Sequence, residues 1–155
     1  MRRLLRRLSQ DSGNAIIEFI FVAVIIMVPS VYFVTAVASV ARSRTAVTQA
    51  AREAGRAFAT AESTADGVSR AQVAVRLAMS DQGLPDDAEL RFVPADHDCR
   101  STQISPVLAP GAIFAVCVVR HALLPGVPSL IAGRGITTIG RYIVHVDDFR
   151  IVKTS

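Results

Sequence analysis

Residues Arg2–Ala41 read RRLLRRLSQDSGNAIIEFIFVAVIIMVPSVYFVTAVASVA, and the order of features in this stretch decides the fold. A basic leader comes first, and a glycine, a glutamate and a long apolar run follow it. The run from Phe19 to Ala41 holds about 23 residues without a formal charge, which at about 1.5 Å per residue crosses a hydrocarbon core of about 30 Å. We therefore expect a transmembrane helix here.

The charges around the run predict its orientation. One aspartate, Asp11, opposes the four arginines of the leader, which are Arg2, Arg3, Arg6 and Arg7. The positive-inside rule then favours a cytoplasmic N-terminus and an extracytoplasmic C-terminal domain. Four more arginines follow the run and weaken the asymmetry: Arg42, Arg44, Arg52 and Arg56.

The run differs from that of a cleaved secretory signal. Such a signal has an apolar region of about 7 to 15 residues followed by a small-residue cleavage site. Here the run is longer, and the small residues Ser12 and Gly13 precede it. The hydrophobic helix is therefore expected to stay with the mature protein.

The residues GNAIIEF at 13–19 resemble the processing site of type IV pilin-like proteins. In that family the prepilin peptidase cleaves after the glycine, which here implies a cut between Gly13 and Asn14. Glu18 would then be the fifth residue of the mature chain. The aromatic Phe19 follows it, as in the tight-adherence branch of the family.

Two further segments are similar to TadE-like pseudopilins of the tight-adherence family: AAREAGR at 50–56 and VDDFR at 146–150. The resemblance implies a minor pseudopilin, a structural subunit in the assembly of a tight-adherence pilus. Its implied partners are prepilin peptidase, other pilin and pseudopilin subunits, the inner-membrane assembly machinery and membrane lipid. The family's major pilin resembles a leader and helix with almost no outer domain, so the length of this chain argues against that role.

Glu18 needs a compensating contact, because an acidic residue within a membrane helix costs about 2.5 to 3.5 kcal/mol on insertion scales. The resemblance implies that its partner is the free α-amine of a neighbouring subunit, which here is Asn14 after cleavage. That pair would fix the axial register between subunits. The alternative is that Glu18 lies close enough to the helix start to reach the lipid headgroups or the amine of its own chain.

Pro29 lies in the middle of the apolar run. Proline removes a backbone donor and can kink a helix, and neighbouring groups make this tolerable in membrane helices. We expect a kink at this position.

The whole sequence divides into four predicted segments: a leader at 1–13, an assembly helix at 14–41, an amphipathic helical region at 42–83 and a small antiparallel β region at 84–155. The apolar stripe of the helical region has steps of three and four residues, at Val47, Ala50, Ala51, Ala54, Phe58 and Ala61. A break is expected at Thr64 to Gly67, and Ser69 with Gln72 has the spacing of a capping box for a second helix, whose stripe ends before Gly83 and Pro85.

After Pro85 the pattern changes to strands. They are expected around Leu90 to Phe92, from Ala112 to Leu123 with period two, and from Thr138 to Val146. The predicted fold class is α+β, with a long N-terminal membrane-spanning helix that continues into an amphipathic helix and packs on a small antiparallel sheet. The family resemblance implies the same pilin-like architecture.

Two cysteines in an extracytoplasmic domain most simply form one disulfide. A bond between Cys99 and Cys117 would tie the loop from Asp96 to Pro110 to the middle strand, and would stabilise by about 3 kcal/mol in the chain-entropy model. The alternative is two unlinked thiols, with Cys117 buried and Cys99 exposed.

The neighbouring sequence Asp96-His97-Asp98-Cys99 contains metal-ligand types. Adjacent residues of an extended chain point to opposite sides, so a solvated loop is favoured and no metal site is predicted. His121 and His145 fall within predicted strands, where a satisfied or exposed histidine is commoner than a catalytic base. No nucleophile elbow or phosphate loop occurs, so neither an enzyme nor a cofactor is predicted.

The positive net charge of +4 does not indicate a nucleic-acid partner. Removal of residues 1–13 leaves 13 basic and 12 acidic residues, and the rest of the chain has no arginine stripe or zinc-finger spacing. The sequence thus predicts a processed pseudopilin. The alternative is an unprocessed, signal-anchored envelope domain that binds a partner or ligand through its outer sheet, and retention of Met1 would favour it.

Overall fold

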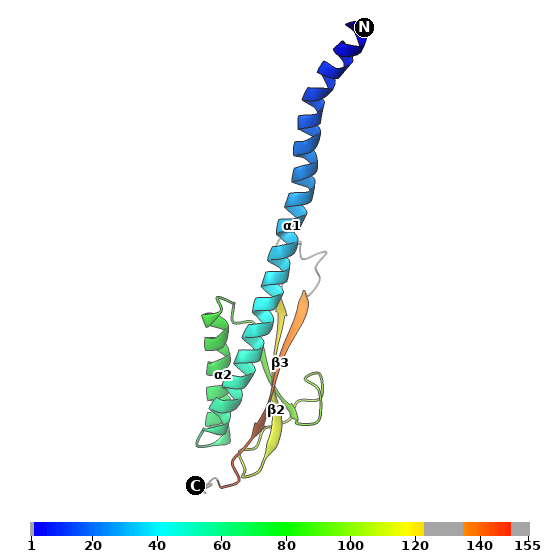
Figure 1. The fold of residues 1–155 in the computed structure, drawn as a ribbon. Coiled ribbons are helices and arrows are strands. Elements are labelled where there is room, and N and C mark those ends of the chain that lie inside the picture. The colour runs from blue at the N-terminus through cyan, green and yellow to red at the C-terminus, as the bar shows by residue number, and fades with distance from the viewer. Residues whose placement is uncertain (1, 123–134, 150–155) are drawn as a thin grey trace. The chain divides into compact units, whose positions relative to one another are not determined.

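The computed structural model describes the backbone of residues 2–122 and 135–149, and side chains from residue 16 onward within these ranges. The fold is α+β (Figure 1). It has the helices α1 (Arg2–Ala59) and α2 (Thr64–Asp81) and the strands β1 (Glu89–Pro94), β2 (Ile113–Ala122) and β3 (Ile136–His145). The chain divides into two compact units, residues 1–38 and residues 39–155, which are described separately below.

The first unit is helical. From Ile16 to Val37 its large apolar side chains are 47% to 74% exposed, and none of them has a core to enter within this unit. Among the described residues, one helix is long and apolar enough to cross a membrane, and it contains this segment. The expected apolar helix is therefore present.

The sheet of the second unit has the order β1-β2-β3, and both pairs of strands are antiparallel. Phe92 of β1 lies opposite Val116, and Val116 lies opposite Tyr142 of β3. The prediction of three antiparallel strands is confirmed, and β2 is the central strand.

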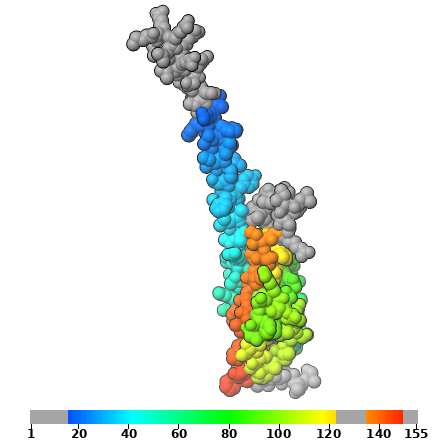
Figure 2. All heavy atoms as spheres, turned by 90° about the vertical axis from the view of Figure 1, so that its right-hand side faces the viewer, coloured from blue at the N-terminus to red at the C-terminus, as the bar shows by residue number. Residues whose placement is uncertain are grey.

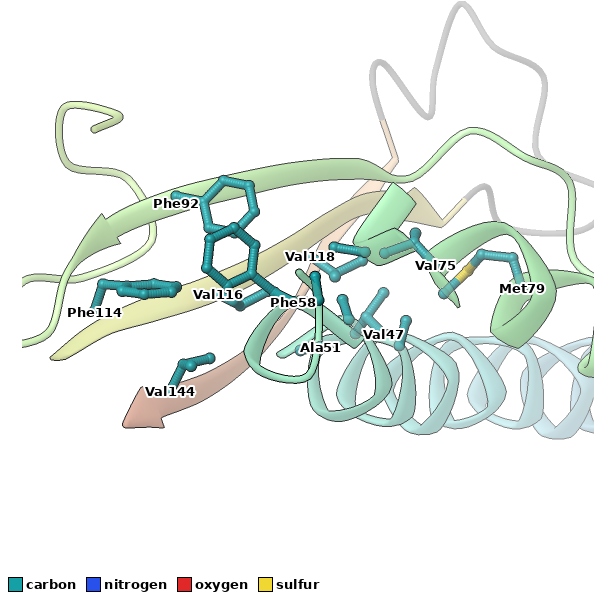
Figure 3. Close-up of a cluster of buried hydrophobic side chains, with 14 of the residues drawn as sticks. Val47, Ala51, Phe58, Val75, Met79, Phe92, Phe114, Val116, Val118 and Val144 are labelled. Carbon is teal, nitrogen blue, oxygen red and sulfur yellow. The ribbon is translucent and has the colours of Figure 1, made fainter. Parts of the chain in front are cut away.

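The helices supply the core that covers one face of this sheet. The predicted stripe is fully buried, at Val47, Ala50, Ala51, Ala54, Phe58 and Ala61. Phe58 of α1 contacts Phe92 of β1 and Phe114 of β2, with ring centroids 5.5 and 5.1 Å away (Figure 3). Tilted and edge-to-face rings of this kind add to the stability that comes from their buried area.

Two glycines allow α1 to lie very close to β3. A Cβ atom on Gly140 of β3 would lie 2.0 Å from the carbonyl oxygen of Val47, which is backbone and cannot move aside. A Cβ atom on Gly55 of α1 would lie 2.5 Å from Cδ1 of Tyr142. Helix and strand are therefore in backbone contact, which explains why the helix face is mostly alanine.

The start of α2 differs from the sequence prediction. The break lies before Thr64 rather than at Thr64 to Gly67, and the N-cap is Ser63, whose hydroxyl accepts a hydrogen bond from the backbone of Asp66. The carboxylate of Asp66 in turn accepts from the backbone of Glu62. These two bonds cap the helix at Ser63. The predicted capping box of Ser69 and Gln72 is therefore wrong, because both residues lie inside the helix.

Gly67 is not a helix breaker. It lies within α2, and a Cβ atom there would lie 2.9 Å from Cδ2 of Phe58. The glycine makes room for the aromatic ring of the core.

The expected period of two in β2 is also wrong. Residues 114–118 are all buried, because the helices cover one face and a second small cluster covers the other. That cluster consists of Val93, Cys99, Ala115 and Cys117. Figure 2 faces the side of the unit on which the loop between β1 and β2 lies.

Gly140→Ala is predicted to destabilise the second unit by about 2 to 3 kcal/mol, because the added methyl group must push the backbone of α1 away from β3. The measurement is thermal unfolding of the full chain in detergent micelles. Thr137→Ala, at an exposed position of the same strand, is the control and should change the melting temperature little. Equal melting temperatures for wild type and Gly140→Ala would contradict the close contact.

Candidate functional site

The predicted processing site lies in the helical backbone of α1. Gly13 and Asn14 are helical, and the side chain of Asn14 lies outside the described residues. Glu18 and Phe19 are exposed, and Phe19 is 74% exposed. No hydrogen bond or ion pair joins the side chain of Glu18 to another described residue. The segment from Ile16 to Val37 thus presents one carboxylate on an otherwise uncharged, largely apolar surface.

This surface determines what the segment can do chemically. An exposed apolar helix is stable in hydrocarbon, because all its backbone groups are satisfied internally. A carboxylate on that surface attracts a cation or hydrogen-bond donor strongly, because no water competes for it in hydrocarbon. The segment can therefore hold a membrane position and recognise a positively charged group near its start.

α1 continues through Pro29. Pro29 has no N–H, so the carbonyl of Ile25 lacks its helical donor. The hydroxyl of Ser30 donates a hydrogen bond of 2.7 Å to the next carbonyl, that of Ile26. The kink expected at Pro29 stays a prediction.

The predicted disulfide between Cys99 and Cys117 is present, with its Cα atoms 5.6 Å apart. It joins the loop after β1 to the central strand. Both cysteines are buried, Cys99 at 5% exposure and Cys117 at 0%, so the alternative with an exposed free Cys99 is wrong. The bond closes the second cluster on the outer face of the sheet.

Arginines hold the same loop from two sides. The guanidinium of Arg91 donates to the carbonyls of Cys99 and Ser101 at 3.1 and 3.3 Å. The guanidinium of Arg141 on β3 donates to the carbonyl of Ala95. These bonds satisfy loop carbonyls that no strand pairs.

The acidic side chains of the loop have partners within the loop. The ring of His97 hydrogen-bonds the Asp96 carboxylate at 2.8 Å, which holds the pKa of Asp96 below its usual value. The backbone N–H of Arg100 does the same for the pKa of Asp98. Within the described ranges, 2–122 and 135–149, no three His, Cys, Asp or Glu residues are grouped as metal ligands. Cys99 is bonded to Cys117 and offers no thiolate.

The two strand histidines have ordinary surroundings. His121 of β2 lies 3.2 Å from the hydroxyl of Thr137, and His145 of β3 lies 3.9 Å from a carboxylate oxygen of Asp148. Both rings are exposed.

Sequence reasoning missed a buried polar network at the start of the second unit. Arg120 of β2 is 7% exposed, and its guanidinium donates to Asp87 at 2.6 Å and to the hydroxyl of Ser43 at 3.1 Å. The Ser43 hydroxyl lies 2.8 Å from that of Thr138, which donates to the Arg120 carbonyl. The only sequence signal is an arginine at the end of a valine-rich strand, and its partners lie 33 and 77 residues away.

The chain matches no family model, no curated protein and no solved structure. The candidate site therefore rests on the residues and geometry of this chain.

Replacement of both cysteines, Cys99→Ala with Cys117→Ala, is predicted to destabilise the second unit by about 3 kcal/mol, because the unfolded chain regains the freedom of an 18-residue loop. Thermal unfolding with and without a reductant measures the effect. The reductant should lower the melting temperature of the wild type and leave that of the double variant unchanged. If the reductant left the melting temperature of the wild type unchanged, the disulfide would not be stabilising.

Proposed function

We propose that this chain is a minor pseudopilin, processed by a prepilin peptidase and built into a tight-adherence, type IV-like pilus as a structural subunit. The observation that carries the proposal is the exposed apolar helix with a single carboxylate, Glu18, placed five residues after Gly13. A helix that serves only as an anchor has no need of a carboxylate at that position.

The role of Glu18 follows from the chemistry of cleavage. A cut after Gly13 creates a new cation, the α-amine of Asn14. In a low-dielectric environment an unpaired carboxylate is costly, and an amine at the same membrane depth offsets that cost. When helices of adjacent subunits pack side by side, a pair between Glu18 of one and Asn14 of the next sets their relative height.

The amine of the same chain is a competing partner. Asn14 and Glu18 are four residues apart, and helical side chains tilt toward the N-terminus, so a contact within one subunit is sterically allowed. The two arrangements differ in one respect. Loss of a contact within one subunit leaves the surfaces between subunits unchanged, whereas loss of a contact between subunits weakens assembly.

The disulfide supports an extracytoplasmic position for the second unit. Structural disulfides persist in oxidising compartments, and this one is buried between the loop and the central strand. The arginines of the leader favour a cytoplasmic N-terminus by the positive-inside rule. Together they support a single-pass topology with the N-terminus inside and the sheet outside.

The proposal implies a set of partners and a pilin-like architecture. The peptidase acts on the leader, the inner-membrane assembly machinery and membrane lipid meet the apolar helix, and other pilin and pseudopilin subunits pack against the chain. The chain itself is a structural subunit, with no catalytic step or cofactor assigned to it.

Gly13→Leu is predicted to block processing, because it places a bulky side chain directly before the bond between residues 13 and 14 that the peptidase would cut. Coexpression with a prepilin peptidase and a mobility shift on gels measure the cleavage. The control is Ser9→Leu, which introduces the same leucine within the leader but away from the bond and should be processed as the wild type is. Normal removal of the leader from Gly13→Leu would place the cut elsewhere.

Glu18→Ala is predicted to leave cleavage largely intact and to reduce incorporation into pili, because the register contact is lost. Sheared pili are assayed for the subunit, with membrane levels as the reference. The control is Thr35→Ala, since the Thr35 hydroxyl bonds only backbone of its own helix in the structure. Wild-type incorporation of Glu18→Ala would refute the register role and favour a contact with headgroups or with the chain's own amine.

One observation favours the second candidate, an unprocessed envelope domain that binds a partner or ligand. A cavity of about 430 Å³ lies on the outer side of the sheet beside the disulfide loop, lined by the carboxylates Asp96 and Asp98 and by His97, Arg100 and Arg141 among others. Because its lining carries charges of both signs, it would suit a polar ligand or partner with both kinds of charge. On this alternative the mature protein keeps Met1.

A further inference from the structure

A groove runs between the two helices of the second unit. It has a volume of about 380 Å³ and is lined by residues 49 and 53 of α1 and by residues 74, 77, 78, 81 and 82 of α2 and its end. Its apolar part consists of Ala74, Ala78 and Leu77, and Leu77 is 58% exposed. Its charged part consists of the carboxylates Glu53 and Asp81. The groove therefore offers an apolar wall that ends at two negative charges.

These carboxylates are weakly used within the chain. Glu53 approaches Arg56 at 3.8 Å with both side chains more than half exposed, and a pair of this kind contributes little. Asp81 forms no ion pair with another described residue. The charges of the groove are therefore available to a partner.

Arg44 and Arg52 are exposed side chains on the neighbouring face of α1, and this pair is called the ridge below. They flank a shallow hollow with Thr45, Thr48 and Gln49, and neither arginine is paired with an acidic side chain among the described residues. They are eight residues apart, which is about 12 Å along a helix. Gln49 lines both the hollow and the groove, so the two surfaces lie side by side on one helix.

We propose that the groove receives the Arg44 and Arg52 ridge of a second copy of this chain. An arginine has an apolar stem and a charged end, so its stem fits against Leu77 while its guanidinium reaches Glu53 or Asp81. The charges of the two surfaces are complementary. This inference rests on the proposed function, because that function places several copies in one membrane with parallel helices.

The contact has a consequence for the assembly. Ridge and groove are different surfaces that meet at Gln49, so the contact is heterologous rather than twofold. It gives a pair of copies a direction, in which one copy supplies the groove and the other supplies the ridge.

Anionic lipid is the competing partner for the ridge, because Arg42 and Arg44 come directly after the apolar run. Lipid accounts for the arginines alone. It gives no role to the acidic groove beside them, whereas a second copy uses both surfaces. The two partners therefore differ in whether Asp81 matters.

The test is cross-linking between two tagged forms of the full chain in vesicles of zwitterionic lipid, with and without added anionic lipid. One form carries Val73→Cys on the exposed side of α2, and the other carries Thr45→Cys beside the ridge. The native cysteines are bonded to each other and do not react with a thiol cross-linker. The expected result is a cross-linked heterodimer in both kinds of vesicle.

Charge reversal then identifies the contact. Asp81→Arg together with Glu53→Arg should lower the heterodimer yield by about tenfold or more, since like charges then face each other. Arg44→Glu with Arg52→Glu should do the same. Reversal of the groove in the form that carries Val73→Cys, combined with reversal of the ridge in the form that carries Thr45→Cys, should restore the yield. Asp81→Asn is a milder variant, and Asp86→Arg, at an exposed site outside the groove, is the control.

Two results would overturn the inference. One is a yield that does not respond to reversal of the groove carboxylates. The other is a heterodimer that needs anionic lipid and responds to the arginines alone, which would assign the ridge to the membrane. Mature N-terminal mass distinguishes the two proposals: a chain that starts at Asn14 and gives either result keeps the pseudopilin function and loses this docking surface.

Discussion

The second unit depends on the contact between the backbones of α1 and β3 at Gly140. A side chain at this position would collide with the carbonyl of Val47, so the helix can lie on the sheet only because the strand carries a glycine there. The alanines of α1 and the room left by Gly55 continue the same close packing along the helix. The phenylalanine cluster fills the far end, and the Arg120 network satisfies the polar groups near Ser43. The lack of a side chain at Gly140 thus sets the distance between α1 and β3, and both the phenylalanine cluster and the Arg120 network depend on that distance.

The sequence predicted those features that repeat along one element. The alanine stripe of α1, the three strands and the cysteine pair were all found, because period, β-branched runs and a pair of thiols are local or nearly local signals. Features set by distant residues were missed. Gly67 looks like a helix breaker until the ring of Phe58 is placed against it, and β2 looks amphipathic until the disulfide loop covers its second face. Arg120 finds its partners only in the folded chain.

The candidate site divides in the same way. The positions of Gly13, Asn14 and Glu18 are a matter of sequence order, and no fold is needed to state them. The groove between Glu53 and Asp81 joins residues from two helices, so its acidic and apolar parts meet only after folding. In the proposed function Gly13, Asn14 and Glu18 place a subunit in the membrane, and in the further inference the groove joins it to a copy of itself. Processing at Gly13 and docking at the groove can each be wrong without the other.

Processing at Gly13 is the central claim, because the register role of Glu18 needs the amine that the cut creates. The most direct measurement is the intact mass and N-terminal sequence of the protein recovered from membranes that contain a prepilin peptidase. The account predicts a chain that begins at Asn14 and retains the whole apolar helix. A chain that begins at Met1 would contradict it and would make the protein an anchored envelope domain.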